Sequence, residues 1–334
     1  MTTMDRRTFL AAATVTATAS PANARAKGKG AIDVHHHAAP DFFMEDLRLR
    51  GPVNPGYQGW TPERSLADME AGGIATAMIS FNNVWAGDDA RAARLARRCN
   101  DYAARMAQDH KGRFGRFVAL PLPNVEASLK EIEYGLDQLK ADGVHMMTSY
   151  GDKWLGEPAF LPVMEELNRR KAVIYTHPTT AKCCGNLIPG IMDVTVEYNT
   201  DTTRAIAGLM FRGTLKRCPD LRFIFSHAGG TAPYIMWRFE AQARNPATRD
   251  TVPAAGVVPT MREHYYDCAQ SAHPVTMQAL AKLVPTAQIL FGSDYPFTTA
   301  KAHMDGLATC GFSATALRAI KRDNAVRLLP TVKT

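Results

Sequence analysis

A run of three histidines is the part of the sequence most suited to chemistry. It stands in the segment Asp33-Val34-His35-His36-His37, at the end of a short apolar stretch. In an extended chain, residues two apart face the same side, so His35 and His37 share one face and His36 points to another. Two neutral imidazoles on one face can bind a transition metal, with Asp33 as a hydrogen-bonding partner behind them. Taken alone, the run is also compatible with a solvated histidine-rich loop.

Three further residues of metal-ligand type follow apolar runs elsewhere in the chain. They are His177, His227 and Asp294, and each stands just past a short run of apolar residues. If these runs are parallel strands of a barrel, their carboxyl ends lie on one face, where active sites are built. A single histidine at a strand end is more often structural. The recurrence at several strand ends in order favours one shared site.

The elements that must position these residues can be read from hydrophobic periodicity. Eight apolar runs rich in β-branched residues alternate with helical patterns, and each interval leaves room for a crossover helix. The runs are Ala31–Val34, Ile74–Ser80, Phe117–Leu120, Val144–Met147, Val173–Thr176, Phe223–Ser226, Tyr265–Cys268 and Ile289–Phe291. This order predicts an α/β fold, a single-domain (β/α)8 TIM barrel over residues 27–334, with a doubly wound open sheet as the alternative.

Helix starts and one long connection add detail to this prediction. Asp88 or Asp89 can cap one helix and Asn124 another, because a short polar side chain at that position accepts from free backbone N–H groups. The connection from Thr179 to Asp201 is too long for a plain turn, which predicts a loop over a site.

Composition and charge exclude several classes of protein. Hydrophobic residues make up 46% and charged residues 21% of the 334 residues, which is typical of a globular protein rather than a disordered or fibrous one. The formal net charge is +7, but the basic residues form no long run, so no nucleic-acid partner is expected. No apolar stretch after residue 26 reaches the roughly 18 residues that a membrane span needs, so no membrane association is expected.

The first 26 residues resemble a twin-arginine export signal. Arg6-Arg7 precedes a weakly apolar stretch, and the small-residue site Ala24-Arg25-Ala26 follows. A cytoplasmic tail is the alternative. The pattern predicts export of the folded chain, with the mature protein periplasmic or secreted.

Six cysteines occur, and only Cys183 and Cys184 are adjacent. No C-x-x-C pair exists, which argues against a zinc finger or a dense disulfide framework. Although an exported compartment permits disulfides, most of the cysteines are predicted to be buried thiols.

Four motifs together resemble the amidohydrolase superfamily. They are D-x-H-x-H at 33–37, H-P at 177–178, H-A-G-G at 227–230 and G-S-D-Y-P at 292–296. More narrowly, they resemble the branch that contains aminocarboxymuconate semialdehyde decarboxylase and the non-oxidative aromatic acid decarboxylases. The resemblance runs from about Ile32 to Leu328. It implies that His35, His37, His177 and Asp294 are metal ligands and that His227 and Asp294 are the catalytic acid or base.

The resemblance also implies how many metal ions the site holds. Members of the superfamily with two metals carry a bridging carboxylated lysine at the end of the fourth strand. Here that position offers His145-Met146-Met147-Thr148, and Lys153 lies well beyond it. One divalent ion is therefore expected, with zinc as the first choice and manganese as the alternative. His145 is expected to be a core or rim residue.

A carboxylate substrate calls for cationic partners, and arginine binds carboxylates in a bidentate manner. The four candidate substrate-binding residues are Arg48, Arg50, Arg204 and Arg238. Each of them could equally be a surface arginine. The resemblance further implies a homodimer in which Arg238 reaches the neighbouring subunit.

These features predict a metal-dependent decarboxylase, a carbon–carbon lyase that acts on a small aromatic or unsaturated carboxylic acid. One alternative is a metal-dependent hydrolase of a lactone, amide or ester on the same mononuclear site. A second is a non-catalytic exported barrel that binds a metal or a ligand. A lyase releases carbon dioxide, a hydrolase consumes water, and a binding protein returns its ligand unchanged.

Overall fold

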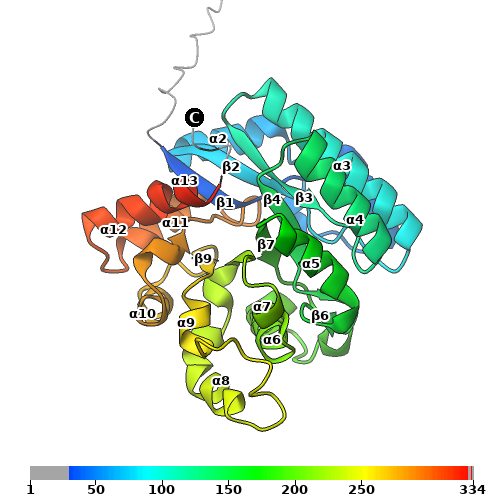
Figure 1. Cartoon of the computed structure of the whole chain (residues 1–334). Coiled ribbons are helices and arrows are strands. Elements are labelled where there is room, and N and C mark those ends of the chain that lie inside the picture. Colours follow the sequence, from blue (N-terminus) through cyan, green and yellow to red (C-terminus); the bar gives the residue numbers. More distant parts are fainter. Residues whose placement is uncertain (1–29, 330–331, 333–334) are drawn as a thin grey trace, which may run out of the picture.

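The chain forms an eight-stranded parallel barrel in the computed structural model, which describes residues 30–329 and 332. The strand order is β1-β2-β3-β4-β7-β8-β9-β10. The strands are β1 (Ala31–His37), β2 (Ile74–Ser80), β3 (Phe114–Ala119), β4 (Gly143–Met147), β7 (Val173–His177), β8 (Arg222–Phe225), β9 (Tyr265–Asp267) and β10 (Ile289–Leu290). All eight predicted runs form strands of this sheet, so the predicted TIM barrel is confirmed. Figure 1 shows the helices arranged as a ring around the strands.

The barrel closes between β1 and the segment that starts at β10. The backbone N–H of Val34 donates to Phe291 O (3.0 Å), and that of His37 donates to Tyr295 O (2.8 Å). In return, the N–H of Asp294 donates to His35 O (2.9 Å). The last of these bonds ties two of the predicted metal ligands together through their backbones.

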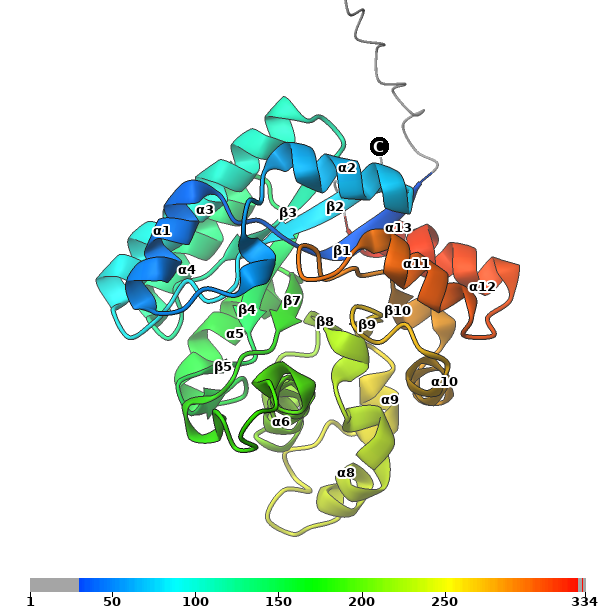
Figure 2. The ribbon, with the colours of Figure 1, turned by 180° about the vertical axis from the view of Figure 1, so that it is seen from behind.

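Thirteen α-helices are described, most of them on the outside of the barrel (Figures 1 and 2). They are α1 (Asp41–Arg50), α2 (Pro62–Gly72), α3 (Asp89–Asp109), α4 (Val125–Glu133), α5 (Leu161–Arg169), α6 (Glu197–Phe211), α7 (Thr214–Arg217), α8 (Met236–Ala243), α9 (Val257–Met261), α10 (Pro274–Leu283), α11 (Ala300–Ala308), α12 (Ala314–Arg318) and α13 (Asn324–Leu328). Both predicted caps are present, since Asp88 accepts from Arg91 N and Asn124 accepts from Ala127 N.

A β-bulge in β1 decides where the histidine run points. Between Asp33 and His36 the pairing with β2 shifts by one residue. Ile32 and Val34 lie in the apolar interior, and the His35 ring lies against Tyr175 (5.3 Å between centroids), which belongs to the same interior cluster. An extra residue in a strand re-aims the side chains that follow it. The bulge therefore keeps His35 on the interior side together with Val34, instead of on the opposite face.

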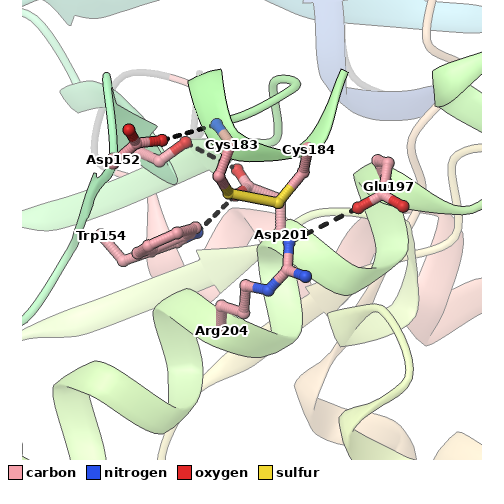
Figure 3. The surroundings of a disulfide bond; sticks show 8 residues. Asp152, Trp154, Cys183, Cys184, Glu197, Asp201 and Arg204 are labelled. Atoms are coloured by element: carbon pink, nitrogen blue, oxygen red, sulfur yellow. Dashed lines mark hydrogen bonds and ion pairs between the residues drawn. A yellow bond between two sulfur atoms is a disulfide. The ribbon is translucent and has the colours of Figure 1, made fainter. Parts of the chain in front are cut away.

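The connection between β7 and α6 is irregular, as predicted, but it is shorter than predicted, because residues 197–201 form the first turn of α6. It contains short 3-10 turns at Lys182–Cys184 and Asp193–Thr195. A disulfide joins the neighbouring residues Cys183 and Cys184, next to the hairpin of β5 (Ser149–Tyr150) and β6 (Lys153–Trp154), as Figure 3 shows. The other cysteines are buried thiols, as predicted; they are Cys99, Cys218, Cys268 and Cys310.

The export signal predicted for residues 1–26 lies outside the described residues. Among residues 30–329, no helix combines the length and the apolar character that crossing a bilayer requires.

Candidate metal centre

Four residues from four strand ends meet at the carboxyl-terminal mouth of the barrel. They are His35 on β1, His177 at the end of β7, His227 just past β8 and Asp294 just past β10. Each offers one ligand atom, and these atoms lie within 4.8 Å of one another. All four residues are buried. Convergence of distant strand ends on one point is what the sequence predicted.

Hydrogen bonds occupy one ring nitrogen of His35 and one of His177. Nδ1 of His35 lies 2.9 Å from Asp267 Oδ2, and Nδ1 of His177 lies 2.7 Å from the carbonyl oxygen of Pro178. The Nε2 atoms of His35, His177 and His227 are buried and have no hydrogen-bond partner. They lie 3.1, 3.9 and 3.7 Å from the Asp294 carboxylate.

Burying unpaired polar atoms costs free energy. Three imidazole nitrogens and a carboxylate at this spacing form a donor set typical of a divalent transition metal. A cation bound by His35 and His177 would satisfy two of the orphaned nitrogens and lie beside the third, that of His227. The residues present therefore fit a single metal ion.

His37 belongs to the same cluster. Its Nε2 lies 3.1 Å from Asp294 Oδ1, and its Nδ1 contacts Ser80 Oγ at 2.8 Å. The sequence-based prediction placed His37 among the ligands and His227 beside the metal. The structure brings both rings to the site, with His227 in the group of closest ligand atoms. Which of the two completes the coordination stays a prediction.

Burial and neighbouring charges set the protonation of the cluster. Burial lowers the pKa of His177 to about 4 and holds that of His37 well below its usual value. Burial alone would raise the pKa of Asp294, but the surrounding imidazoles hold it well below its usual range. Against the effect of burial, the carboxylates of Asp267 and Asp294 raise the pKa of His35 to about 10. The carboxylate of Asp294 is thus held ionised and the rings of His37 and His177 neutral, the forms in which these groups bind a metal.

Several residues at the strand ends around the site have a left-handed backbone conformation. Five non-glycine residues that follow strands have positive φ; they are Asn83 (56°), His227 (52°), Ala228 (57°), Gln270 (51°) and Asp294 (60°). Such conformations cost free energy and persist where the surroundings fix them, often at functional sites. At His227 the backbone N–H is held by Asp267 Oδ1 (3.0 Å).

With this geometry in place, comparison with known proteins identifies the family. The sequence profile of the family described as "Amidohydrolase" matches residues 32–331. The chain belongs to the amidohydrolase family.

Several curated relatives of the chain are named as decarboxylases. It is 35% identical over 322 residues to a 6-methylsalicylic acid decarboxylase of Aspergillus aculeatus, covering 90% of this chain and 96% of the relative. It is 34% identical over 323 residues to a protein of Aspergillus niger described as a decarboxylase, covering 90% and 87%. Among solved structures, a 5-carboxyvanillate decarboxylase of Novosphingobium aromaticivorans with bound manganese has the same fold, with a TM-score of 0.80, 19% identity and coverage of 92% and 98%.

Three site residues escaped the sequence analysis. Asp267 binds the His35 ring and the backbone N–H of His227. The side-chain amide of Gln270 donates to Asp294 Oδ2 (3.1 Å), and Asn82 Nδ2 lies 3.3 Å from His37 Nε2. All three stand at or just past strand ends, so the rule that found the ligands could have found them too.

Asp33 holds the backbone at the end of β1 and does not bind the ring of a candidate metal ligand. It accepts from the backbone N–H of His35 (3.0 Å) and from Ser293 Oγ (2.5 Å), and it contacts the ring of His36 (3.1 Å). The His36 ring points away from the metal cluster and stacks on Tyr295. The prediction that His36 faces elsewhere is confirmed.

The four candidate arginines occupy different surroundings. Arg50 is part-buried and binds Asp46 (2.8 Å) and the carbonyl oxygen of Asn83 (2.6 Å). Arg204 on α6 lies 5.6 Å above the Trp154 ring and 3.5 Å from Glu197. Arg48 and Arg238 are exposed, and neither has a hydrogen bond or ion pair with the metal cluster in the described chain. A role for any of the four in substrate binding stays a prediction.

Three aromatic rings lie near the histidines of the cluster. Tyr198 lies 6.1 Å from the His177 ring, and Phe297 lies 5.8 Å from the His37 ring. Tyr57 packs on Phe297 at 4.8 Å. Tyr198 and Phe297 thus line the cluster with aromatic surface.

Proposed function

We propose that this chain is a metal-dependent, non-oxidative decarboxylase of a small aromatic acid. The observation that carries the proposal is the group of three buried, unpaired Nε2 atoms facing Asp294 at the mouth of the barrel. The decarboxylase names of its relatives, which align over most of both chains, support the reaction. The aromatic rings beside the histidines support a planar substrate.

One divalent ion is the proposed cofactor. Bound here, it would supply Lewis-acid polarisation of a substrate carboxylate or phenol oxygen. Three imidazoles and a carboxylate do not select one metal by ligand type. Zinc was the first choice from sequence, whereas manganese in the structure of the 5-carboxyvanillate decarboxylase makes manganese the first ion to test.

The residues of the chain itself would position the acid and move one proton. His227 and Asp294 are the proposed acid–base pair, with His227 Nε2 lying 3.7 Å from Asp294 Oδ2. A proton delivered to the ring carbon that bears the carboxylate would be followed by cleavage of the carbon–carbon bond. The bonding pair returns to the ring and carbon dioxide leaves, so that acid anion and proton become arene and gas.

A hydroxybenzoate such as 6-methylsalicylate is the proposed substrate class, because one relative carries that name. Arg50 or Arg204 would bind the anion, and Arg238 would act across a homodimer. Export by the twin-arginine route also belongs to the proposal, and a disulfide between Cys183 and Cys184 suits an oxidising compartment.

Carbon dioxide release by the purified chain tests the proposal. The protein is stripped with a chelator, reloaded with Mn²⁺ or Zn²⁺, and offered 6-methylsalicylate and related phenolic acids. We expect gas release only after reloading, and its loss in His227→Ala with the metal still bound. Failure of the metal-loaded protein to release carbon dioxide from any of these acids would contradict the proposal. Hydrolysis of a lactone by the same sample would favour the hydrolase instead.

A further inference from the structure

One buried carboxylate outside the metal cluster is that of Asp201. Asp201 on α6 is 1% exposed, and no ion pair is found for it within the described residues. Its four hydrogen-bond donors come from three segments of the chain; they are Thr148 Oγ1, Ser149 Oγ (3.1 Å), Trp154 Nε1 (2.5 Å) and the backbone N–H of Thr179 (3.4 Å). Figure 3 shows Trp154 reaching Asp201 beside the disulfide.

One of these donors holds the strand end that carries His177, and another lies in the turn after it. The backbone N–H of Thr148 donates to the carbonyl oxygen of His177 (2.9 Å). Thr179 follows His177 by two residues and begins the connection to α6. Asp201 therefore binds Thr148, which holds the His177 backbone, and Thr179, which lies in the turn after His177.

Close backbone contact fixes Asp201 itself. A Cβ added to Gly156 would lie 2.4 Å from the backbone carbon of Gly208 on α6, so only glycine allows this approach. The hairpin of β5 and β6 thus sits directly on α6. The same hairpin holds the outer end of the loop, since Asp152 Oδ1 accepts from the backbone N–H of Cys183 (2.7 Å).

Burying a carboxylate that has no cationic partner costs free energy, and its hydrogen bonds must offset this cost. Apolar packing would stabilise α6 at lower cost. The four donors instead connect the end of β4, the hairpin, the turn after His177 and α6 at one point. Residues behind a metal ligand orient it and tune affinity for the ion.

We propose that Asp201 is a positioning residue that orients His177 for metal binding by holding Thr148 and Thr179. The inference rests on the proposed function, because it takes His177 to be a ligand. Asp201 contacts neither the metal cluster nor the reacting atoms, so its effect is on the affinity for the ion.

Calorimetric titration of the full-length, metal-stripped chain with Mn²⁺ tests this role. Asp201→Asn keeps the shape but removes the charge and presents an amide to the hydroxyl donors. We expect its Mn²⁺ affinity to fall about tenfold or more. Glu131→Gln is the matched control, because Glu131 is a buried carboxylate that binds Arg97 and Asn100 on α3, away from the ligand-bearing strands. That variant should melt at a lower temperature and keep its affinity within twofold.

A pair of variants at Thr148 covers the case in which Asp201→Asn does not fold. Thr148→Val loses the hydroxyl donor and should lower the affinity severalfold, whereas Thr148→Ser keeps the hydroxyl and should restore it. Equal affinities of wild type, Asp201→Asn and Thr148→Val would overturn the inference while the proposed function stands. Absence of Mn²⁺ binding by the wild type would instead overturn the proposed function, and the inference with it.

Discussion

The two ends of the barrel interior are lined by neighbouring residues of the same strands. At one end, Ile32, Val34 and Phe117 form an apolar cluster, in which Phe117 stacks on Tyr175 at 5.2 Å. One residue beyond Val34, His35 begins a mouth filled with buried polar groups. We call these regions the apolar floor and the polar mouth.

The contrast shows that one end of the barrel provides stability and the other end holds the candidate metal site. The floor gains stability from buried apolar surface and is close-packed. The mouth holds unpaired nitrogens and left-handed residues, both of which cost free energy. A site of this kind persists because the sequence of the rest of the barrel favours the same fold throughout and so holds the strand ends in place. Floor and mouth should therefore respond differently to mutation.

Phe117→Ala should have the largest effect, and it should fall on stability. Phe117 is 1% exposed, and truncating it leaves a cavity in the floor. We expect a loss of about 3–5 kcal/mol in the free energy of unfolding, measured by denaturant titration. The folded fraction should bind Mn²⁺ with nearly unchanged affinity. A large fall in affinity without loss of stability would break the division between floor and mouth.

Asp294→Ala should have the opposite profile. It removes the carboxylate that faces all three unpaired Nε2 atoms. Substitution of a residue that hydrogen-bonds to a metal ligand already lowers metal affinity about 10- to 100-fold. Loss of the carboxylate itself should therefore lower Mn²⁺ affinity more than about 100-fold and abolish carbon dioxide release. Calorimetry and the far-ultraviolet circular dichroism spectrum provide the measurement. Retention of Mn²⁺ within tenfold of wild type would argue against a ligand role for Asp294.

Asp267→Asn should have an intermediate effect. The Asp267 carboxylate binds the His35 ring and raises its pKa, and the amide of asparagine orients the ring less strongly. We expect about a tenfold loss of Mn²⁺ affinity with a smaller change in stability. An unchanged affinity would show that the His35 ring is oriented by packing alone.

Glu166→Gln should have the smallest effect and provides a pH control outside both regions. Glu166 on α5 binds Arg169 (2.8 Å) and Arg170 (2.6 Å). Hydrogen bonding from Arg169 is the main cause that lowers its pKa from 4.5 to about 2. Because this pKa is depressed in the folded state, the stabilisation is present above pH 4.5 and is lost as the pH falls towards 2.

In thermal melts, the difference between wild type and Glu166→Gln should therefore shrink on acidification across that window. At pH 7 it should be below about 1 kcal/mol, as for other pairs near the surface. A difference that grows on acidification would contradict the assigned cause. Mn²⁺ affinity at pH 7 should not change.

How far the sequence predicts the molecule depends on the range of the interaction. The strands and the caps at Asp88 and Asn124 follow from local periodicity and side-chain chemistry, and the structure confirms them. Convergence of His177 and Asp294 follows from barrel topology. The bulge after Asp33 leaves no local signal, because the pattern of the run fits a regular strand equally well.

Long-range partners explain the remaining gaps. Asp267 on β9 reaches His35 on β1 past the intervening β10, and Asp201 joins segments that lie far from it in the chain. Neither stands in a motif, so only the folded arrangement shows what they bind. The disulfide of Cys183 and Cys184 depends on how the loop turns, which composition does not determine.

Anomalous diffraction at the manganese absorption edge, from crystals of the chain grown with Mn²⁺, tests the central claim most directly. The account predicts one strong peak at the polar mouth, about 2.0–2.3 Å from Nε2 of His35, Nε2 of His177 and a carboxylate oxygen of Asp294. The same map would show whether His37 or His227 completes the coordination. A map with no peak between these three side chains, or with its strongest peak elsewhere on the barrel, would contradict the account.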